Sequence, residues 1–302
     1  MPSSPVPPLP AGRLVPALIV LLCLIWGSTW WAIRICLHDQ PPLTSAALRF
    51  LVAGAAMAAL ATRWRKADSL PSPPTWLWLV TGATCFAGSY GLLYVAERTV
   101  PSGVAAVLWA VFPLLMAGNG VLFLGERLRA VQWLGFLVSF GGVVIVFASD
   151  LGGSDPAAVP LVDAVLVLAS PVVSAIGTTL VKRFGKGTSS LRLNRNGMLF
   201  GGVLLAIAAF ASERDATLHW SPAGIAATAY LALCGTALTF GVYFWLLQRV
   251  PATRLSLISY VTPVLAMLLG TAVGDGHADQ ALWLGTAAVI AGVALVVQQG
   301  RR

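Results

Sequence analysis

Residues 133–143 read WLGFLVSFGGV, and residues 283–293 read WLGTAAVIAGV. The two stretches lie 150 residues apart and share WLG at their start and GV at their end. The same shift places Pro113 on Pro263. Leu and Val match often by chance in an apolar chain, so the Trp, Gly and Pro matches carry the signal. The sequence therefore predicts an internal repeat of about half the chain.

Apolar residues make up 58% of the 302-residue chain and charged residues only 10%, whereas a soluble globular chain carries about 25% charged residues. Ten runs approach the roughly 20 apolar residues that a bilayer-spanning helix needs. Continuous runs exclude the alternating strands of a barrel, so we predict an all-α integral membrane protein. The ten predicted transmembrane spans are 14–36, 43–62, 76–96, 101–124, 131–148, 161–181, 196–212, 222–247, 252–273 and 281–298.

Each half of the chain contains five predicted spans, so the second half enters the membrane from the side opposite to the first. With ten spans, fifteen of the nineteen Lys and Arg residues fall on the side that carries both termini. Positive residues stay cytoplasmic, which predicts that both termini are cytoplasmic. In carriers, inverted repeats of this kind pack around a mid-membrane site, so we expect two inverted five-helix repeats around a central cavity.

The domain organisation follows from this count. We predict a Pro-rich cytoplasmic tail at 1–13, a first five-helix repeat at 14–148, a periplasmic linker at 149–160 and a second five-helix repeat at 161–299.

Four short motifs follow one another along the first half of the chain. Ile25-Trp26-Gly27-Ser28-Thr29 lies in the first span and Arg49-Phe50 in the second. Val100-Pro101-Ser102-Gly103 opens the fourth span, and Gly125-Glu126 closes it. This set, in this order, resembles the EamA-like family of the drug/metabolite transporter superfamily, and the resemblance extends from the first span to the tenth. It implies a ten-helix fold with a cavity between the halves. It also implies export or exchange of small metabolites, such as amino acids, or of drug-like compounds.

Aromatic and small polar residues gather near the middle of several spans. A carrier cavity needs aromatic walls with hydrogen-bonding tips, although Trp and Tyr also gather at lipid–water interfaces. Asn119 either binds substrate or ties two helices together. The predicted substrate-binding residues are Trp26, Ser28, Thr29, Tyr90, Tyr94, Trp109, Asn119, Tyr243 and Tyr260.

Two prolines and two charged residues complete the candidate site. Pro113 and Pro263 lie mid-span at matching positions, and proline kinks a helix, so we predict a pair of hinges; the alternative is a static kink that neighbouring helices repair. Arg49 lies near the outer end of the second span, where a charge is costly without a partner. We predict a charge pair with Glu97. Capture of an anionic substrate group and snorkelling to the interface are the alternatives.

The chain carries no zinc-protease, nucleophile-elbow or P-loop motif, which argues against an enzyme and against an ATP-driven pump. Its basic residues are spread between apolar runs, so we expect no nucleic-acid partner, and its four cysteines lack metal-ligand spacing, so we expect no metal or cofactor. We predict a secondary carrier or exporter of small organic metabolites in the inner membrane. The alternative is a membrane-embedded enzyme or scaffold acting on lipid. The substrate, flux direction, coupling ion and oligomeric state stay open.

Overall fold

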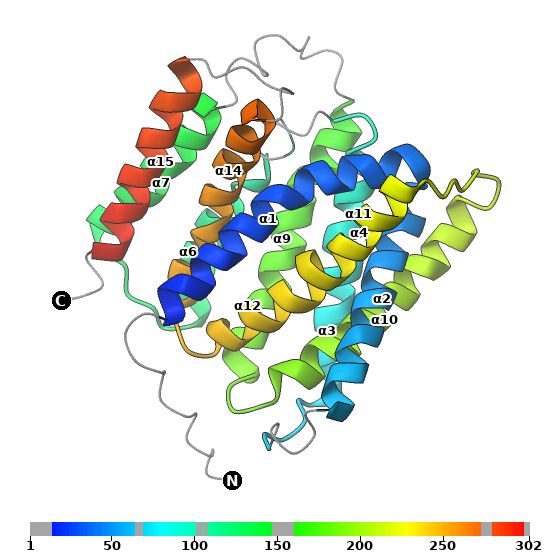
Figure 1. Ribbon diagram of the computed structural model, residues 1–302. Coiled ribbons are helices and arrows are strands. Elements are labelled where there is room, and N and C mark those ends of the chain that lie inside the picture. The colour runs from blue at the N-terminus through cyan, green and yellow to red at the C-terminus, as the bar shows by residue number, and fades with distance from the viewer. Residues whose placement is uncertain are drawn as a thin grey trace.

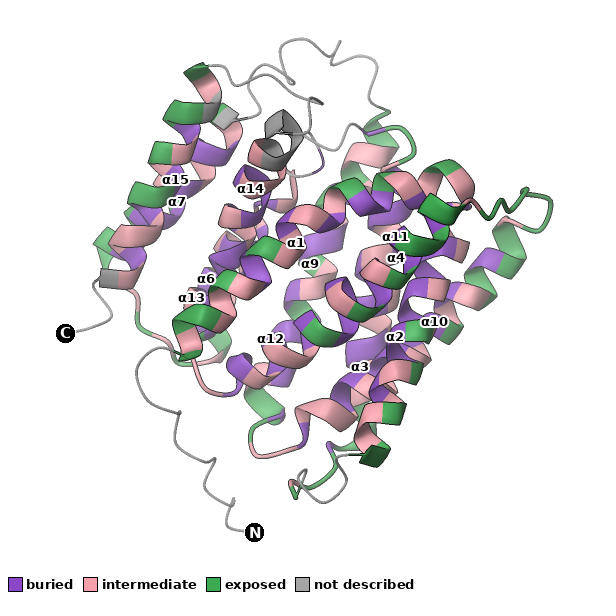
Figure 2. Ribbon diagram, viewed as in Figure 1, coloured by how far each residue is buried: buried purple, intermediate pink, exposed green. Residues whose placement is uncertain are grey.

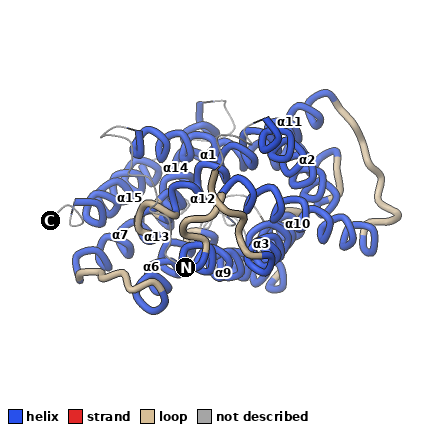
Figure 3. Tube along the Cα trace, turned by 90° about the horizontal axis from the view of Figure 1, so that it is seen from below, coloured by secondary structure: helices blue, strands red, loops and turns tan. Residues whose placement is uncertain are grey.

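The computed structural model describes residues 14–63, 69–100, 105, 108–146, 160–272 and 280–298. Every regular element in this part of the chain is a helix (Figures 1 and 3), and helical segments occupy all ten predicted spans. The predicted tail at 1–13 lies outside the described residues, as does the linker at 149–160 apart from Pro160. The prediction of a ten-helix, all-α chain is confirmed.

The helices follow the apolar runs closely. The first half consists of α1 (Leu14–Asp39), α2 (Pro42–Arg63), α3 (Thr75–Thr81), η1 (Gly82–Gly88), α4 (Ser89–Ala96), α6 (Phe112–Phe123) and α7 (Ala130–Val146). The second half consists of α9 (Leu161–Phe184), α10 (Ser190–Ser212), α11 (Pro222–Ala232), η3 (Leu233–Leu238), α12 (Thr239–Leu247), α13 (Ala252–Ser256), α14 (Ile258–Ala272) and α15 (Gln280–Gln298). Among the described residues, six continuous helical spans are long and apolar enough to cross a membrane, and three further helices are apolar but shorter.

Figure 2 shows which faces of the helices are exposed and which are buried. Many large apolar side chains are exposed, whereas a set of polar side chains is buried. Leu161 is 80% exposed and Leu122 is 74% exposed, while Thr236 and Asn194 are fully buried. Water would penalise so much exposed apolar surface, and lipid does not. The distribution of side chains therefore agrees with a protein that is surrounded by lipid.

The third and eighth spans each contain a π-helical segment. These segments, η1 and η3, occupy matching positions under the 150-residue shift, because residues 82–88 correspond to 232–238. A π-helical turn is rare, and it is found frequently at functional sites. Its recurrence in both halves supports the equivalence of the two spans.

Two helix pairs join the halves through reciprocal contacts. The helices α7 and α15 lie side by side (Figure 1). A Cβ atom added to Gly135 would lie 2.7 Å from the Gly292 carbonyl oxygen, and one added to Gly142 would lie 2.8 Å from the Gly285 carbonyl oxygen. Only small residues permit such close backbone approach. Gly135 thus contacts the counterpart of Gly142, and Gly142 contacts the counterpart of Gly135, as expected for two related halves.

The helices α2 and α10 form the second reciprocal pair. Gly54 of α2 packs on Leu199 of α10, and Gly202 of α10 packs on Leu51 of α2. In these two helices corresponding residues are 148 positions apart, two fewer than in the later spans.

Six further spans form two groups. The helix α1 packs on α11, α12 and α14, and we call these elements, with η3, the α1 group. The helix α9 packs on α3, η1, α4 and α6, which we call the α9 group. We name the two ends of the bundle the Leu14 end and the Asp39 end, after the first and last residues of α1.

The two predicted hinge prolines have different surroundings. Pro113 is the second residue of α6, which begins at Phe112. A helix tolerates proline in its first turn, because the missing N–H would have no intrahelical partner there. Pro263 instead lies inside α14, where it removes a backbone hydrogen bond. Among the described residues, Pro263 thus lies inside a helix, whereas Pro113 lies in the first turn of one, and the hinge role of both stays a prediction.

Candidate functional site

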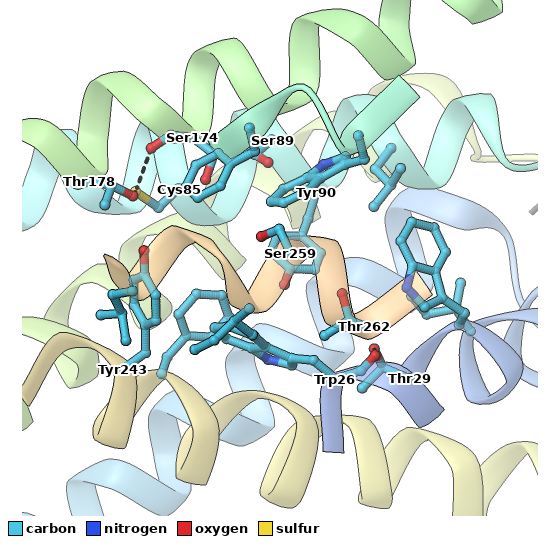
Figure 4. Close-up of a pocket in the computed structure, with 18 of the residues that line it drawn as sticks. Trp26, Thr29, Cys85, Ser89, Tyr90, Ser174, Thr178, Tyr243, Ser259 and Thr262 are labelled. Atoms are coloured by element: carbon cyan, nitrogen blue, oxygen red, sulfur yellow. Dashed lines mark hydrogen bonds between the residues drawn. The ribbon is translucent and has the colours of Figure 1, made fainter. Parts of the chain in front are cut away.

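A cavity of about 830 Å³, part of it open to solvent, lies where the α1 group and the α9 group face each other (Figure 4). Both groups contribute to its wall, and α2 contributes Arg49. Of the residues predicted to bind substrate, five line the cavity: Trp26, Thr29, Tyr90, Trp109 and Tyr243. Four do not line it: Ser28, Tyr94, Asn119 and Tyr260.

Trp26 fixes the wall that belongs to the α1 group. Its indole N–H donates to the Thr239 hydroxyl at 3.0 Å and to the Gly235 carbonyl at 3.3 Å. The indole also packs against the rings of Phe240 and Tyr243, each with centroids 5.4 Å away. These contacts hold a broad aromatic surface toward the cavity (Figure 4).

Trp109 plays the same part in the α9 group. Its indole N–H donates to the Ser170 hydroxyl at 3.0 Å, and that hydroxyl donates to the Ser89 carbonyl oxygen at 2.9 Å. The Trp109 ring stacks on Phe112 with centroids 5.0 Å apart. An ordered aromatic wall therefore stands on each side of the cavity.

Arg49 lies in the wall with only 1% of its surface exposed. Its guanidinium donates to the Thr236 hydroxyl at 2.6 Å, to the Tyr94 hydroxyl at 3.1 Å and to the Gly235 carbonyl at 3.1 Å. The guanidinium carbon also lies 4.8 Å from the centre of the Tyr90 ring. All of these partners are neutral.

Glu97 is not among the partners of Arg49, so the predicted charge pair is not a direct contact. The Glu97 side chain lies in a second cavity, at the Asp39 end, with Arg34, His38 and Arg98. Its Oε1 atom is buried and has no hydrogen-bond partner among the described residues. Burial raises the pKa of the Glu97 carboxyl to about 8, although Arg49 and Arg34 act to lower it. The guanidinium is instead held by the Thr236 hydroxyl and the Gly235 carbonyl of η3.

The predicted residues outside the cavity have structural contacts instead. Ser28 hydrogen-bonds the Tyr230 hydroxyl, and Tyr94 hydrogen-bonds Arg49. The Asn119 carboxamide donates to the Thr179 hydroxyl at 3.0 Å, which ties α6 to α9 and favours the second of its two predicted roles. Tyr260 is fully buried against Phe136.

Apart from Thr29, the small polar residues in the wall were missed by the sequence reasoning. The missed residues with hydroxyl or thiol groups are Cys85, Ser89, Ser174, Thr178, Ser259 and Thr262. Ser174 and Thr178 are four residues apart and Ser259 and Thr262 three, so each pair shares a helix face. This spacing inside an apolar run is the signal that could have found them.

At the Leu14 end of the bundle, two charged residues, Lys182 and Glu126, join the two sides by hydrogen bonds. Lys182 of α9 donates to the Leu247 carbonyl at 2.7 Å and to the Val250 carbonyl at 2.6 Å. Glu126, which follows α6, accepts from the Ala252 N–H at 2.7 Å and from the Thr253 hydroxyl at 2.6 Å. Charge-assisted hydrogen bonds of this kind are roughly twice as strong as neutral ones.

Fold and cavity together define a polytopic helical membrane protein with a ligand-sized central site. Residues 14–148 and 162–298 each match the EamA-like transporter family. The chain therefore belongs to the EamA-like transporter family, and it is a membrane transporter rather than an enzyme. The resemblance seen in the sequence is confirmed.

Individual relatives match over most of the chain. The inner membrane transporter YedA of Escherichia coli K12 is 32% identical over 277 residues, which cover 91% of this chain and 88% of YedA. The transporter YoaV of Bacillus subtilis is 25% identical over 252 residues, covering 83% of this chain and 86% of YoaV. A solved crystal structure superposes with a TM-score of 0.81 at 22% identity, over 95% of this chain and 97% of the other. That likeness concerns the fold.

Proposed function

We propose that this protein is a secondary carrier that moves small organic solutes across the inner membrane by alternating access. The observation that carries the proposal is a central cavity between two helix groups, with hydrogen bonds that join the two sides at one end of the bundle. A carrier needs such a site, because the solute must be reachable from one side at a time.

The arrangement of contacts supports two inverted repeats. The α1 group contains spans one, eight and nine, and the α9 group contains spans six, three and four. Exchanging the two halves of the chain converts each group into the other. The reciprocal contacts of α7 with α15 and of α2 with α10 fit the same exchange. Five spans per half invert the second half relative to the first.

The charge distribution supports an orientation with both termini in the cytoplasm. In Figure 1, α1 begins and α15 ends at the same end of the bundle. The side predicted to carry these ends holds most of the basic residues, and positive residues stay cytoplasmic. The relative YedA is named an inner membrane transporter. We therefore assign the Leu14 end to the cytoplasm and the protein to the inner membrane.

In this orientation the cavity is closed toward the cytoplasm. Opening it there requires breaking the bonds of Glu126 and Lys182, and closing the Asp39 end at the same time. Pro263 in α14 is the proposed site of bending, because an interior proline weakens the helix locally. Pro113 serves as the start of α6 and as a second, weaker bending point.

Counterflow in proteoliposomes tests this proposal. Purified protein is reconstituted in liposomes preloaded with one unlabelled compound from a panel of amino acids, organic acids, amines and drug-like aromatics. Uptake of the same labelled compound is then measured. We expect transient accumulation for at least one compound, and none with Thr262→Trp, which fills the cavity. Absence of counterflow with every compound contradicts a carrier.

A further inference from the structure

The charge balance of the central cavity is uneven. Among its described lining residues, Arg49 is the only one with a permanently charged side chain, and none is Asp or Glu. The guanidinium has five N–H donors, of which three donate to neutral partners and two have no acceptor among the described residues. A buried charge is stable only when it is paired or well hydrogen-bonded. The wall thus presents a positive charge without a matching anion.

Glu97 does not supply that anion. Its carboxyl lies in the separate cavity at the Asp39 end and makes no hydrogen bond to Arg49. Burial raises the pKa of Glu97 to about 8, which disfavours its charged form. Asp39 is also engaged elsewhere, because its carboxylate accepts hydrogen bonds from Ser221.

The remaining wall suits an apolar body. Phe112, Phe240 and Tyr243 line the cavity together with Leu255 and Ile258. Hydroxyl groups such as those of Ser259 and Thr262 offer neutral hydrogen bonds (Figure 4). No described lining residue offers a carboxylate to an ammonium group.

We propose that Arg49 binds the carboxylate of the transported solute, and that the substrates are amphipathic monoanions rather than zwitterions or cations. An Arg guanidinium matches a carboxylate with two parallel hydrogen bonds. The bound solute would complete the charge pair that the protein itself lacks, while its apolar part contacts the aromatic walls. This inference rests on the proposed carrier function, since it names the substrate class of the same cavity.

Equilibrium binding to the purified full-length protein tests it without requiring transport. Isothermal titration compares 3-phenylpropionate with three compounds that share its phenyl body: the neutral 3-phenylpropionamide, the cation 3-phenylpropylamine and the zwitterion phenylalanine. Butyrate and hexanoate, each with its amide, extend the series. We expect each acid to bind at least tenfold more tightly than its amide, and 3-phenylpropionate to bind more tightly than phenylalanine. Equal binding of acids and amides, or no binding of any acid at 10 mM, overturns the proposal.

Variants assign the preference to Arg49. In Arg49→Gln the acid-to-amide ratio should fall to near one, and in Arg49→Lys it should fall only partly, because the charge remains. Arg98→Gln removes a positive charge from the other cavity and should preserve the ratio. If Arg49→Gln does not fold, the acid-to-amide affinity ratios of the wild type and of Arg49→Lys still test whether Arg49 sets the preference for acids. An unchanged ratio in Arg49→Lys together with loss in Arg98→Gln contradicts the assignment.

Binding and counterflow can fail separately. Acid-selective binding without counterflow of any compound would contradict the carrier and leave the anion site standing. Counterflow of amines or zwitterions without acid preference would contradict the anion site and leave the carrier standing.

Discussion

Lys182 in the second half and Arg34 in the first half occupy corresponding positions, 148 residues apart, at opposite ends of the bundle. Lys182 donates to the Leu247 and Val250 carbonyls and closes the Leu14 end. At the Asp39 end, Arg34 and Glu97 line a cavity. Glu97 is the residue of the first half that corresponds to Leu247. The Leu14 end thus carries hydrogen bonds between the two sides, and the Asp39 end carries a cavity lined by charged residues.

The comparison separates packing from polar chemistry. Where the halves pack on each other, they use the same glycines in the same places. Where they face the cavity they differ: Arg49 of α2 corresponds to Gly197 of α10, at the 148-residue spacing that relates Gly54 to Gly202. The shared glycine contacts would allow either end of the bundle to open while the other closes. The difference between Arg49 and Gly197 places a positive charge on one side of the cavity only.

The largest effect is expected where the halves are alike. Gly142→Ala would place a Cβ atom 2.7 Å from the Val289 backbone nitrogen, and overpacking of this kind costs about 1–3 kcal/mol. The neighbouring Gly141 has open space around its added Cβ, so Gly141→Ala should be neutral or raise stability by up to about 1 kcal/mol. Thermal unfolding in detergent measures both. Equal effects would mean that α7 and α15 do not pack as described.

The closed end gives the next largest effect. Lys182→Met removes two charge-assisted hydrogen bonds, which should raise the population open to the cytoplasm roughly tenfold. The readout is the labelling rate of Ser259→Cys, in a chain without its native cysteines, by an impermeant maleimide added to the cytoplasmic face. Lys186→Met is the matched control, since Lys186 is exposed beside the same helix end. Identical labelling rates in the Ser259→Cys parent, Lys182→Met and Lys186→Met would show that Lys182 does not hold the cytoplasmic end closed.

The two prolines give a smaller difference. Pro263→Ala restores a backbone hydrogen bond inside α14 and should slow counterflow by about fivefold, whereas Pro113→Ala at the start of α6 should change it by less than about twofold. Circular dichroism and monodispersity check that both variants fold. Equal slowing would indicate that the prolines act as the symmetric pair that the sequence predicted.

The smallest effect concerns Glu97 and pH. The carboxyl of Glu97 is neutral below its pKa of about 8 and gains a negative charge above it. Raising the pH from 7 to 9 should therefore weaken binding of 3-phenylpropionate by about threefold, because the new charge partly offsets Arg49. Arg34, His38 and Arg98 share the cavity of Glu97, and Arg49 and Arg34 act to lower its pKa.

Glu97→Gln isolates this contribution from those neighbours. The variant should show the same affinity at pH 7 and pH 9. A threefold loss that persists in Glu97→Gln would assign the pH dependence to another group.

Much of the fold was readable from the sequence because its signals are local. Apolar length predicted ten helices, and the Trp, Gly and Pro spacing predicted the repeat. The π-helical segments were not predictable, because they depend on tertiary packing around Gly82–Gly88 and Leu233–Leu238. For the same reason, the partners of Arg49 could not be read from its own span, since two of them belong to η3. Aromatic site residues were predicted more readily than Ser174 or Thr262, because single small hydroxyl residues do not stand out within an apolar run.

Paired distance measurements test the central claim, alternating access between the two helix groups, most directly. Spin labels at Leu14 and Lys186 report on the cytoplasmic end, and labels at His38 and Arg98 report on the outer end; all four positions are exposed. Pulsed electron resonance should show two populations for each pair. Conditions that lengthen the Leu14–Lys186 distance should shorten the His38–Arg98 distance. A single unchanging distance at both ends, with and without solute, would contradict the account.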